Sequence, residues 1–261
     1  MLVLTSKKER LFIMASKEMK GIILAGGAGT RLYPLTKVTS KQLLPVYNKP
    51  MIQYPLETLI RAGIKDILII VAPDHAGDFL KCLGSGKEYG CHFTYEIQDK
   101  PEGIAQAFLI GQDFIDHDNV TLILGDNLYE DDFSEAIKTF KSGGRIFAKK
   151  VVDPQRFGVV EFNENNKAIS IEEKPKHPKS EYSVTGLYIY DSTVIEKIKS
   201  LSFSDRGELE ITDLNNLYLK EDKLDVAFVK GKWFDTGTFE SMHEAITFAR
   251  DRHLAKEARS L

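Results

Sequence analysis

Three short apolar runs in the first half of the chain constrain its fold most strongly. They lie at residues 21–24, 67–71 and 120–124, are rich in Ile, Leu and Val, and are separated by segments with helical periodicity. This alternation predicts βαβ units and a parallel sheet. Between the first two runs we expect a helix with Pro50 in its first turn and Gly63 just past its end, because proline suits helix starts and glycine suits helix ends.

The second half of the chain has shorter strand-like runs, at 157–162, 168–171 and 184–190, separated by turn-forming residues. We expect a β-rich layer there, followed by helices at about 210–219 and 239–252. The sequence therefore predicts an α/β fold: a Rossmann-like, mostly parallel sheet flanked by helices, with a β-rich second part.

Composition narrows the class of protein. The 261 residues carry 35 Lys and Arg against 38 Asp and Glu, a formal net charge of −3, so no global positive charge favours nucleic acid as a partner. No apolar run approaches the roughly 20 residues that cross a bilayer. Cys82 and Cys91, the two cysteines, lack the spacing of a disulfide framework or a zinc site. We expect a cytoplasmic protein that binds neither nucleic acid nor membrane.

A glycine-rich turn directly follows the first apolar run. Gly26, Gly27 and Gly29 free the main chain to bring several N–H groups to one phosphate, and Arg31 adds a forked cation. Phosphate binding is favoured here over an ordinary strand-to-helix turn. The spacing excludes a dinucleotide-binding fingerprint, which needs glycine where Leu32 stands, and also a P-loop, which needs a lysine after the glycines.

Sequence blocks along the chain resemble those of the sugar-phosphate nucleotidyltransferases. The glycine turn LAGGAGTR at 24–31 is followed by SKQLLP at 40–45. Further blocks in family order are GIAQA at 103–107, LGDN at 124–127, RFGVV at 156–160, EEKP at 172–175, VTGLY at 184–188, GELEITD at 207–213 and DTGT at 235–238. The resemblance runs from Lys20 to about Arg250 and is strongest for the glucose-1-phosphate thymidylyltransferase branch.

The resemblance implies an enzyme that transfers a deoxythymidylyl group from dTTP to glucose 1-phosphate and releases pyrophosphate. One phosphate oxyanion must approach an anionic triphosphate, so the chemistry needs cations and positioning rather than a nucleophilic side chain. Mg²⁺ as cofactor and a homo-oligomer are implied as well. UTP as donor, another sugar 1-phosphate, and a catalytically silent sugar-nucleotide sensor remain alternatives.

Asp126 and Asp235 are the predicted metal ligands. Asp126 follows the buried-looking run at 120–124, at the sheet edge where α/β proteins place ligands, and Asp235 follows the apolar stretch at 228–234. Two carboxylates together with substrate phosphates suit Mg²⁺. Either aspartate alone is as readily a helix N-cap; the resemblance favours metal binding for the pair.

The resemblance also assigns the remaining site residues. Arg31 and Lys174 are the expected catalytic cations, on the leaving pyrophosphate and on the sugar phosphate. The nucleotide is expected to contact Gly26, Gly27, Gly29, Thr30, Arg31, Lys41, Gln42, Gln98 and Gly103. The sugar phosphate is expected to contact Asn127, Gly158, Glu173, Lys174 and Val184. In this scheme the Gln98 amide faces the pyrimidine. Without the resemblance, Lys41, Gln42 and Lys174 would be interpreted as solvent-facing side chains.

A single nucleotidyltransferase domain is expected over residues 20–261. Its nucleotide-binding part lies at about 20–150 and its sugar-binding part at about 151–250. Residues 1–19 are expected to be an N-terminal extension, because they precede the first predicted strand. An export signal is not expected there, because charged residues interrupt the apolar run that such a signal needs.

The chain departs from the branch in two places. Phe157 stands where many members have tyrosine, which removes a hydroxyl near the sugar. The chain also ends soon after Arg250, where longer members add a helical segment that helps to form an assembly contact and an effector site. A short form without that segment is expected.

Overall fold

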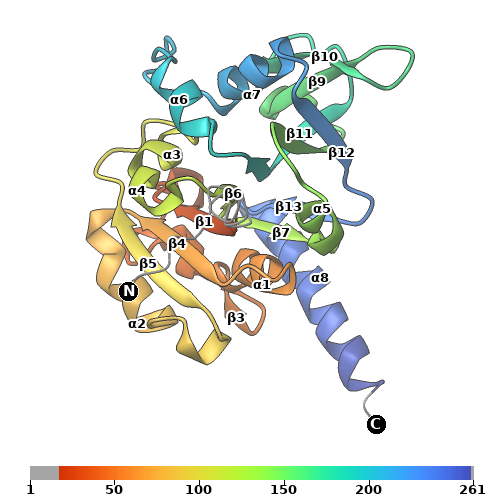
Figure 1. Ribbon diagram of the computed structural model, residues 1–261. Coiled ribbons are helices and arrows are strands. Elements are labelled where there is room, and N and C mark those ends of the chain that lie inside the picture. Colours follow the sequence, from red (N-terminus) through yellow and green to blue (C-terminus); the bar gives the residue numbers. More distant parts are fainter. Residues whose placement is uncertain (1–17, 260–261) are drawn as a thin grey trace, which may run out of the picture.

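The computed structural model describes residues 18–259, in which nine strands form one mixed sheet with helices packed on both faces (Figure 1). The predicted α/β fold with a Rossmann-like core is therefore confirmed. The N-terminal extension expected at residues 1–19 lies, except for Glu18 and Met19, outside the described residues.

Thirteen strands occur between residues 18 and 259, nine of them in the main sheet. They are β1 (Met19–Ala25), β2 (Pro45–Val46), β3 (Lys49–Pro50), β4 (Asp66–Val71), β5 (His92–Ile97), β6 (Asn119–Leu124), β7 (Asn127–Tyr129), β8 (Gly144–Lys150), β9 (Gly158–Phe162), β10 (Ala168–Glu173), β11 (Tyr182–Tyr190), β12 (Leu224–Phe228) and β13 (Trp233–Asp235). The main sheet has the order β10-β9-β11-β6-β1-β4-β5, and β8 pairs with β11 and β12.

Eight α-helices accompany the strands over the same described range. They are α1 (Gln53–Arg61), α2 (Ala76–Leu83), α3 (Gln106–Ile110), α4 (Gln112–Ile115), α5 (Ser134–Lys138), α6 (Val194–Lys199), α7 (Ile211–Lys220) and α8 (Phe239–Glu257). Helices α1 and α2 cover one face of the sheet, whereas α3, α4, α6 and α7 cover the other. Figure 1 shows α8 running away from the body of the molecule toward the C-terminus.

The parallel half of the sheet follows from its apolar runs. Strands β6, β1, β4 and β5 are parallel neighbours, and the runs predicted at 21–24, 67–71 and 120–124 are confirmed as three of them. Their side chains serve both layers: Ile22 packs into one apolar cluster and Ile23 into the other. Strands buried on both faces need such continuous apolar sequences.

The expectation for Pro50 is wrong, while that for Gly63 is confirmed. Pro50 lies in β3, where it pairs with Pro45 of β2, and the helix begins only at Gln53. The segment stays extended because the Met51 N–H donates to the Leu44 carbonyl at 2.9 Å. Gly63 has φ +86°, the left-handed conformation that ends a helix at low cost in glycine.

The second half contains the strands expected there, and β9, β10 and β11 pair antiparallel. The runs at 157–162, 168–171 and 184–190 correspond to β9, β10 and β11, and β11 joins the parallel half through its antiparallel pairing with β6. The two helices expected at about 210–219 and 239–252 are α7 and α8, and α8 continues to Glu257. The sheet thus links the two halves of the chain through β6 and β11.

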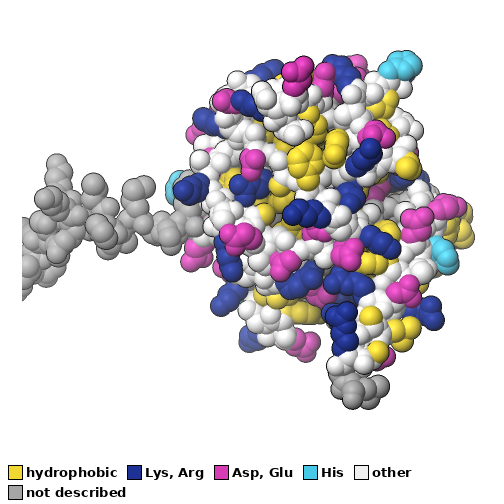
Figure 2. Space-filling model, turned by 90° about the vertical axis from the view of Figure 1, so that its right-hand side faces the viewer, with side chains coloured by type: hydrophobic (Ala, Val, Ile, Leu, Met, Phe, Trp, Pro, Cys, Tyr) yellow, Lys and Arg dark blue, Asp and Glu magenta, His cyan; other side chains and the backbone are white. Residues whose placement is uncertain are grey.

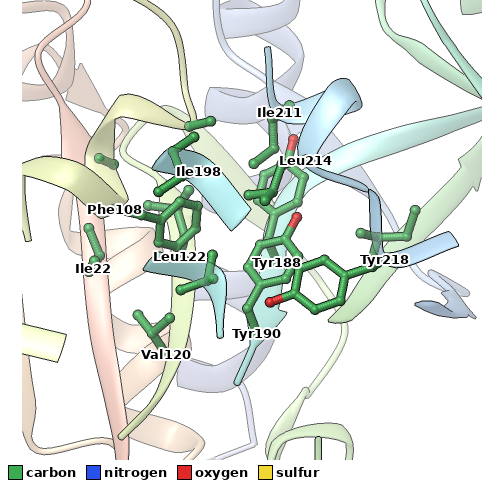
Figure 3. Packing of buried hydrophobic residues seen from close by; sticks show 14 of the residues in the cluster. Ile22, Phe108, Val120, Leu122, Tyr188, Tyr190, Ile198, Ile211, Leu214 and Tyr218 are labelled. Atoms are coloured by element: carbon green, nitrogen blue, oxygen red, sulfur yellow. The ribbon is translucent and has the colours of Figure 1, made fainter. Parts of the chain in front are cut away.

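Buried aromatic rings join the helices to the sheet on the side of α3 and α7. Phe108 of α3 meets Tyr190 of β11 edge to face, with ring centroids 5.3 Å apart. Tyr190 also stacks on Tyr218 of α7 at 5.2 Å. Figure 3 shows Phe108 beside Leu122 of β6, with Tyr190 between Phe108 and Tyr218. The packing fixes strand β11 between the two halves.

The surface carries no obvious segregation of charge on the face shown in Figure 2, where basic and acidic side chains are interspersed. This matches the near balance of charge in the sequence. In the part of the chain that the structure describes, no helix is both long and apolar enough to cross a membrane.

We expect Phe108→Ala to lower the free energy of unfolding by about 3–5 kcal/mol, because it removes a fully buried ring from this cluster and leaves a cavity. Urea unfolding followed by circular dichroism measures the change. Leu80→Ala, at an exposed position of α2, is the control. Its expected loss in the free energy of unfolding is below about 1 kcal/mol. Equal losses in the two variants would contradict this account of the core.

Candidate functional site

A cavity of about 310 Å³ lies beyond the end of β6 and extends across to β10 and β11. It brings together eight of the predicted site residues: Arg31, Asp126, Asn127, Gly158, Glu173, Lys174, Val184 and Asp235. Of the predicted nucleotide-binding residues, all within the described part of the chain, Arg31 alone lines it. A larger, more open hollow of about 1010 Å³ beside α8 contains none of the predicted residues.

The glycine turn after β1 lies against the residues predicted to bind the base. A Cβ added at Gly26 would come within 2.1 Å of Gln98 Oε1, so only glycine allows this approach. Gln98 is itself held by Gln106, whose Oε1 accepts from its amide at 2.6 Å. Gly103 has φ +102° and a Cβ there would meet the Leu209 carbonyl. The structure thus brings the glycine turn and Gln98 together beside the cavity.

Lys41 and Gln42 are buried, so their interpretation as solvent-facing side chains is wrong. The Lys41 ammonium donates to Asp126 Oδ2, and the two side chains are only 10% and 12% exposed. Gln42 is 2% exposed and accepts a 2.7 Å hydrogen bond from Ser40 Oγ. Both lie on a 3₁₀ turn, η3 (Lys41–Leu43), that packs beneath the end of β6. Lys41 therefore places a cation directly on a predicted metal ligand.

Asp126 and Asp235 belong to one two-stranded ribbon. Strand β13 pairs with β7 so that Asp235 faces Asn127, the neighbour of Asp126. The next residue, Thr236, contacts Asp126 directly. Its N–H and its Oγ1 both donate hydrogen bonds to the Asp126 carbonyl, at 3.1 and 2.6 Å. The ribbon holds the two carboxylates at the same cavity.

The alternative role of each aspartate as a helix N-cap is wrong. Asp126 leads into strand β7 and not into a helix. Helix α8 is capped by Thr238, whose Oγ1 accepts the Ser241 N–H at 3.2 Å in a capping box. Neither carboxylate is therefore committed to a helix terminus.

The two carboxylates have opposite electrostatic surroundings. Burial opposes ionisation of Asp126, but the Lys41 ammonium and the Asn127 amide, which donates at 3.0 Å, outweigh it and lower the pKa of Asp126. Burial, and then the negative charge of Asp126, raise the pKa of Asp235 to about 6, although Lys41, Arg31 and Arg156 act in the opposite sense. One buried negative charge thus resists the formation of the second.

The carboxylates of Asp126 and Asp235 suit a hard cation such as Mg²⁺ that takes its remaining ligands from elsewhere. Within residues 18–259 no three His, Cys, Asp or Glu side chains gather into a metal-binding group, which leaves Asp126 and Asp235 as a pair. Magnesium binds through one or two carboxylates and takes its other oxygens from substrate phosphates and water. A cation between the two carboxylates would also relieve their mutual repulsion.

Arg31 enters the same cavity from the 3₁₀ turn η1 (Thr30–Leu32) after the glycine loop. A Cβ added at Gly237 would lie 2.5 Å from Arg31 Nη2, so the missing side chain at 237 leaves room for the guanidinium. The positive charge of Arg31 favours ionised Asp235. Arg31 therefore lies between the glycine turn and the metal-ligand pair.

Glu173 and Lys174 approach the cavity from the end of β10. Lys174 has φ +43° and its ammonium lies 3.4 Å from Glu173 Oε1, with the lysine side chain 48% exposed. Glu173 Oε2 accepts a 2.6 Å hydrogen bond from Thr212 Oγ1 on α7. The lysine can turn toward a ligand, whereas the glutamate is held in place.

Three residues that line the cavity were missed at the sequence level. Arg156 lies 3.6 Å from Asp235, Thr212 donates to Glu173, and Trp233 Nε1 donates to Asn127 Oδ1 at 2.6 Å. Arg156 and Thr212 lie inside the blocks RFGVV and GELEITD, so the sequence could have indicated them. Their partners Asp235 and Glu173 could not be predicted from the sequence. Phe157, noted as a departure from tyrosine, packs against Trp233 with ring centroids 5.1 Å apart.

We expect Asp235→Asn to stabilise the protein without metal by about 2–3 kcal/mol at pH 7.5. The pKa of Asp235 is about 6 in the folded protein and 3.8 in the reference state, so wild type loses stability as pH rises between these values. The gain of the variant is therefore near zero below pH 4 and complete above pH 6. Urea unfolding in EDTA at pH 4 and 7.5 measures it, with exposed Asp74→Asn as control. A gain that is absent at pH 7.5 would contradict the raised pKa of Asp235.

The chain is similar to known proteins over most of its length. The family described as nucleotidyl transferase matches residues 20–252. A glucose-1-phosphate thymidylyltransferase of Neisseria meningitidis serogroup A is 55% identical over 238 residues, covering 89% of this chain and 83% of the relative. The protein of that name from Mycolicibacterium smegmatis is 54% identical over 237 residues, covering 89% of this chain and 82% of the relative.

Solved structures give the same result. A Bacillus anthracis chain described as a glucose-1-phosphate thymidylyltransferase, solved with sucrose, is 51% identical with a TM-score of 0.86, covering 90% of this chain and 96% of that chain. A UDP-glucose pyrophosphorylase bound to UDP-glucose is 24% identical with a TM-score of 0.78, covering 90% and 99%, and shares the fold. With this agreement in sequence and fold, the chain belongs to the nucleotidyl transferase family, in its glucose-1-phosphate thymidylyltransferase branch.

Proposed function

We propose that the chain catalyses attack by a phosphate oxygen of glucose 1-phosphate on the α-phosphorus of dTTP. A new P–O bond forms while the bond between the α-phosphorus and the oxygen bridging to the β-phosphate breaks, so the products are dTDP-glucose and pyrophosphate. The observation that carries the proposal is the single cavity in which Arg31 and Lys174 meet Asp126 and Asp235. The substrates follow from the name shared by the relatives at more than half identity.

Asp126 and Asp235 are the proposed ligands of Mg²⁺. Their support is the ribbon that brings both to one cavity, where burial and then the charge of Asp126 raise the pKa of Asp235. When bound, the ion would neutralise charge on phosphate oxygens at the reacting centre. Lys41 keeps Asp126 ionised and ready to coordinate, because it lowers the pKa of that carboxyl.

The chain's own cations meet the two anionic substrates. Arg31 is proposed to stabilise the leaving pyrophosphate, because it follows the glycine turn whose N–H groups suit phosphates. Lys174 is proposed to hold the phosphate of the sugar, and its half-exposed position leaves it able to turn toward that ligand. Both substrates are then held in line by charge and position, with no covalent intermediate.

The remaining contacts divide between two parts of the one domain. In the nucleotide-binding part, at about 20–150, Gln98 is proposed to face the pyrimidine and the glycine turn to face the triphosphate, which their mutual contact supports. In the sugar-binding part, at about 151–250, Glu173 is proposed to accept hydrogen bonds from sugar hydroxyls, since Thr212 fixes its orientation. The cavity draws residues from both parts.

UTP stays an alternative donor, because uracil and thymine present the same edge to the Gln98 amide. We expect full-length protein with Mg²⁺ and glucose 1-phosphate to release pyrophosphate with dTTP faster than with UTP. Asp126→Asn should lower the rate by about a hundredfold or more, because it removes a charge aimed at the reacting centre. Asp74→Asn is the control. Nucleotide binding without release from any of dTTP, UTP, ATP, GTP or CTP would favour the silent sensor instead.

We also expect Lys174→Met to raise the KM for glucose 1-phosphate by about tenfold to a hundredfold, since a charged hydrogen bond to phosphate is lost. The KM for dTTP should change little. Initial rates over both substrates measure the split. Lys176→Met, an exposed lysine two residues away, is the control. A change in the KM for dTTP alone would place Lys174 on the other substrate.

A further inference from the structure

The loop at residues 229–232, which leads into β13, is held by side chains that lie outside the cavity. Asp131 accepts the N–H groups of Lys230 and Gly231 with its two carboxylate oxygens, the first at 2.7 Å. The neighbouring Glu130 accepts the N–H of Lys232 at 2.9 Å. Two adjacent carboxylates just after β7 thus accept hydrogen bonds from three consecutive backbone N–H groups of this loop.

The carbonyl groups of the same loop converge on one cation. Lys149 of β8 donates to the carbonyls of Val229, Lys230 and Gly231, at 3.3, 3.0 and 2.7 Å. An ammonium has three N–H donors, so this side chain is fully used. We call Glu130, Asp131 and Lys149 the loop clamp.

The loop has no backbone group left to form other hydrogen bonds. The Val229 N–H donates to the Ala148 carbonyl and the Lys232 carbonyl accepts the Glu130 N–H, each at 2.9 Å. At Gly231 a Cβ would fall 2.3 Å from Asp131 Oδ1, so the clamp closes around a bare main chain. Every N–H and C=O of residues 229–232 therefore has a protein partner, which fixes the path of the loop.

The clamp sits at one end of the ribbon whose other end carries the metal ligands. Strands β7 and β13 lie side by side (Figure 1), and only Trp233 and Phe234 lie between the loop and Asp235. At the far end, Thr236 holds the Asp126 carbonyl. With both ends tied, β13 cannot slide or twist along β7, so the place of Asp235 relative to Asp126 depends on the loop.

We propose that Glu130, Asp131 and Lys149 are positioning residues that set Asp235 at the metal site without touching substrate or metal. The inference rests on the proposed coordination by Asp126 and Asp235. Residues that orient metal ligands from outside the coordination sphere commonly change metal affinity or activity by tenfold to a hundredfold. A loop tied only for overall stability would not alter metal affinity in the folded protein.

The test compares adjacent lysines of β8. Lys149→Met removes the clamp cation, whereas Lys150→Met removes an exposed lysine paired with Glu181 at 2.6 Å and serves as the matched control. Mn²⁺ binding to the full-length protein is measured from the paramagnetic resonance signal of the free ion, and circular dichroism confirms folding. We expect Mn²⁺ to bind about tenfold more weakly to Lys149→Met, unchanged to Lys150→Met, and largely restored in Lys149→Arg. Asp131→Asn is the second variant if Lys149→Met does not fold.

The concentration of Mg²⁺ needed for half-maximal pyrophosphate release should rise in parallel with the loss of Mn²⁺ binding. If folded Lys149→Met or Asp131→Asn binds Mn²⁺ as the Lys150→Met control does, while Asp235→Asn abolishes binding, the clamp proposal is overturned and the metal site stands. If the unsubstituted protein and Asp235→Asn bind Mn²⁺ alike, the metal site and the clamp both fall.

Discussion

The mutual repulsion of Asp126 and Asp235 is the constraint on which the rest of the site depends. Two carboxylates in a buried place cannot both ionise at low cost unless positive charge lies close by. The structure supplies that charge from three separate segments, through Lys41, Arg31 and Arg156. The site is thus built around two acidic side chains that repel each other and the basic side chains that offset this repulsion.

The sheet explains why such distant residues meet. Parallel strands β1 and β6 end at the same edge of the sheet, so the glycine turn and Asp126, which follow them, lie side by side. Strand β11 then runs antiparallel to β6 and brings the second half against the first. The aromatic packing of Tyr190 with Phe108 and Tyr218 fastens this junction. The cavity is therefore bounded by rigid elements, and its charged side chains extend from their ends.

The strands of the fold could be predicted because burial on both faces demands unbroken apolar runs, as at residues 67–71. Helices α7 and α8 were also predicted, at about 210–219 and 239–252. Pro50 was misplaced because it forms a two-residue strand that pairs with Pro45 across a tight turn, in which Tyr47 has φ +59°. Proline is also common in the first turn of helices, so the local pattern favoured the wrong element.

Site residues divide in the same way. Those with an unusual local chemistry, such as the glycines before Arg31 or the acid after an apolar run, could be proposed from the residues. The burial of Lys41 was not, because a lysine becomes an internal cation only when another strand supplies its carboxylate. Thr212 and Trp233 escaped notice for the same reason, since their roles are to hold Glu173 and Asn127 and exist only in three dimensions.

The contact between Gly26 and Gln98 has a consequence for how enzymes of this kind can diverge. The turn proposed to meet the triphosphate and the amide proposed to meet the base touch directly, with no space for even a methyl group between them. A new base preference that needs a bulkier side chain at position 98 must therefore disturb the phosphate turn as well. Nucleotide choice in this scaffold is expected to shift through residues around Gln98 rather than at it, and substitutions at the two positions should be inherited together.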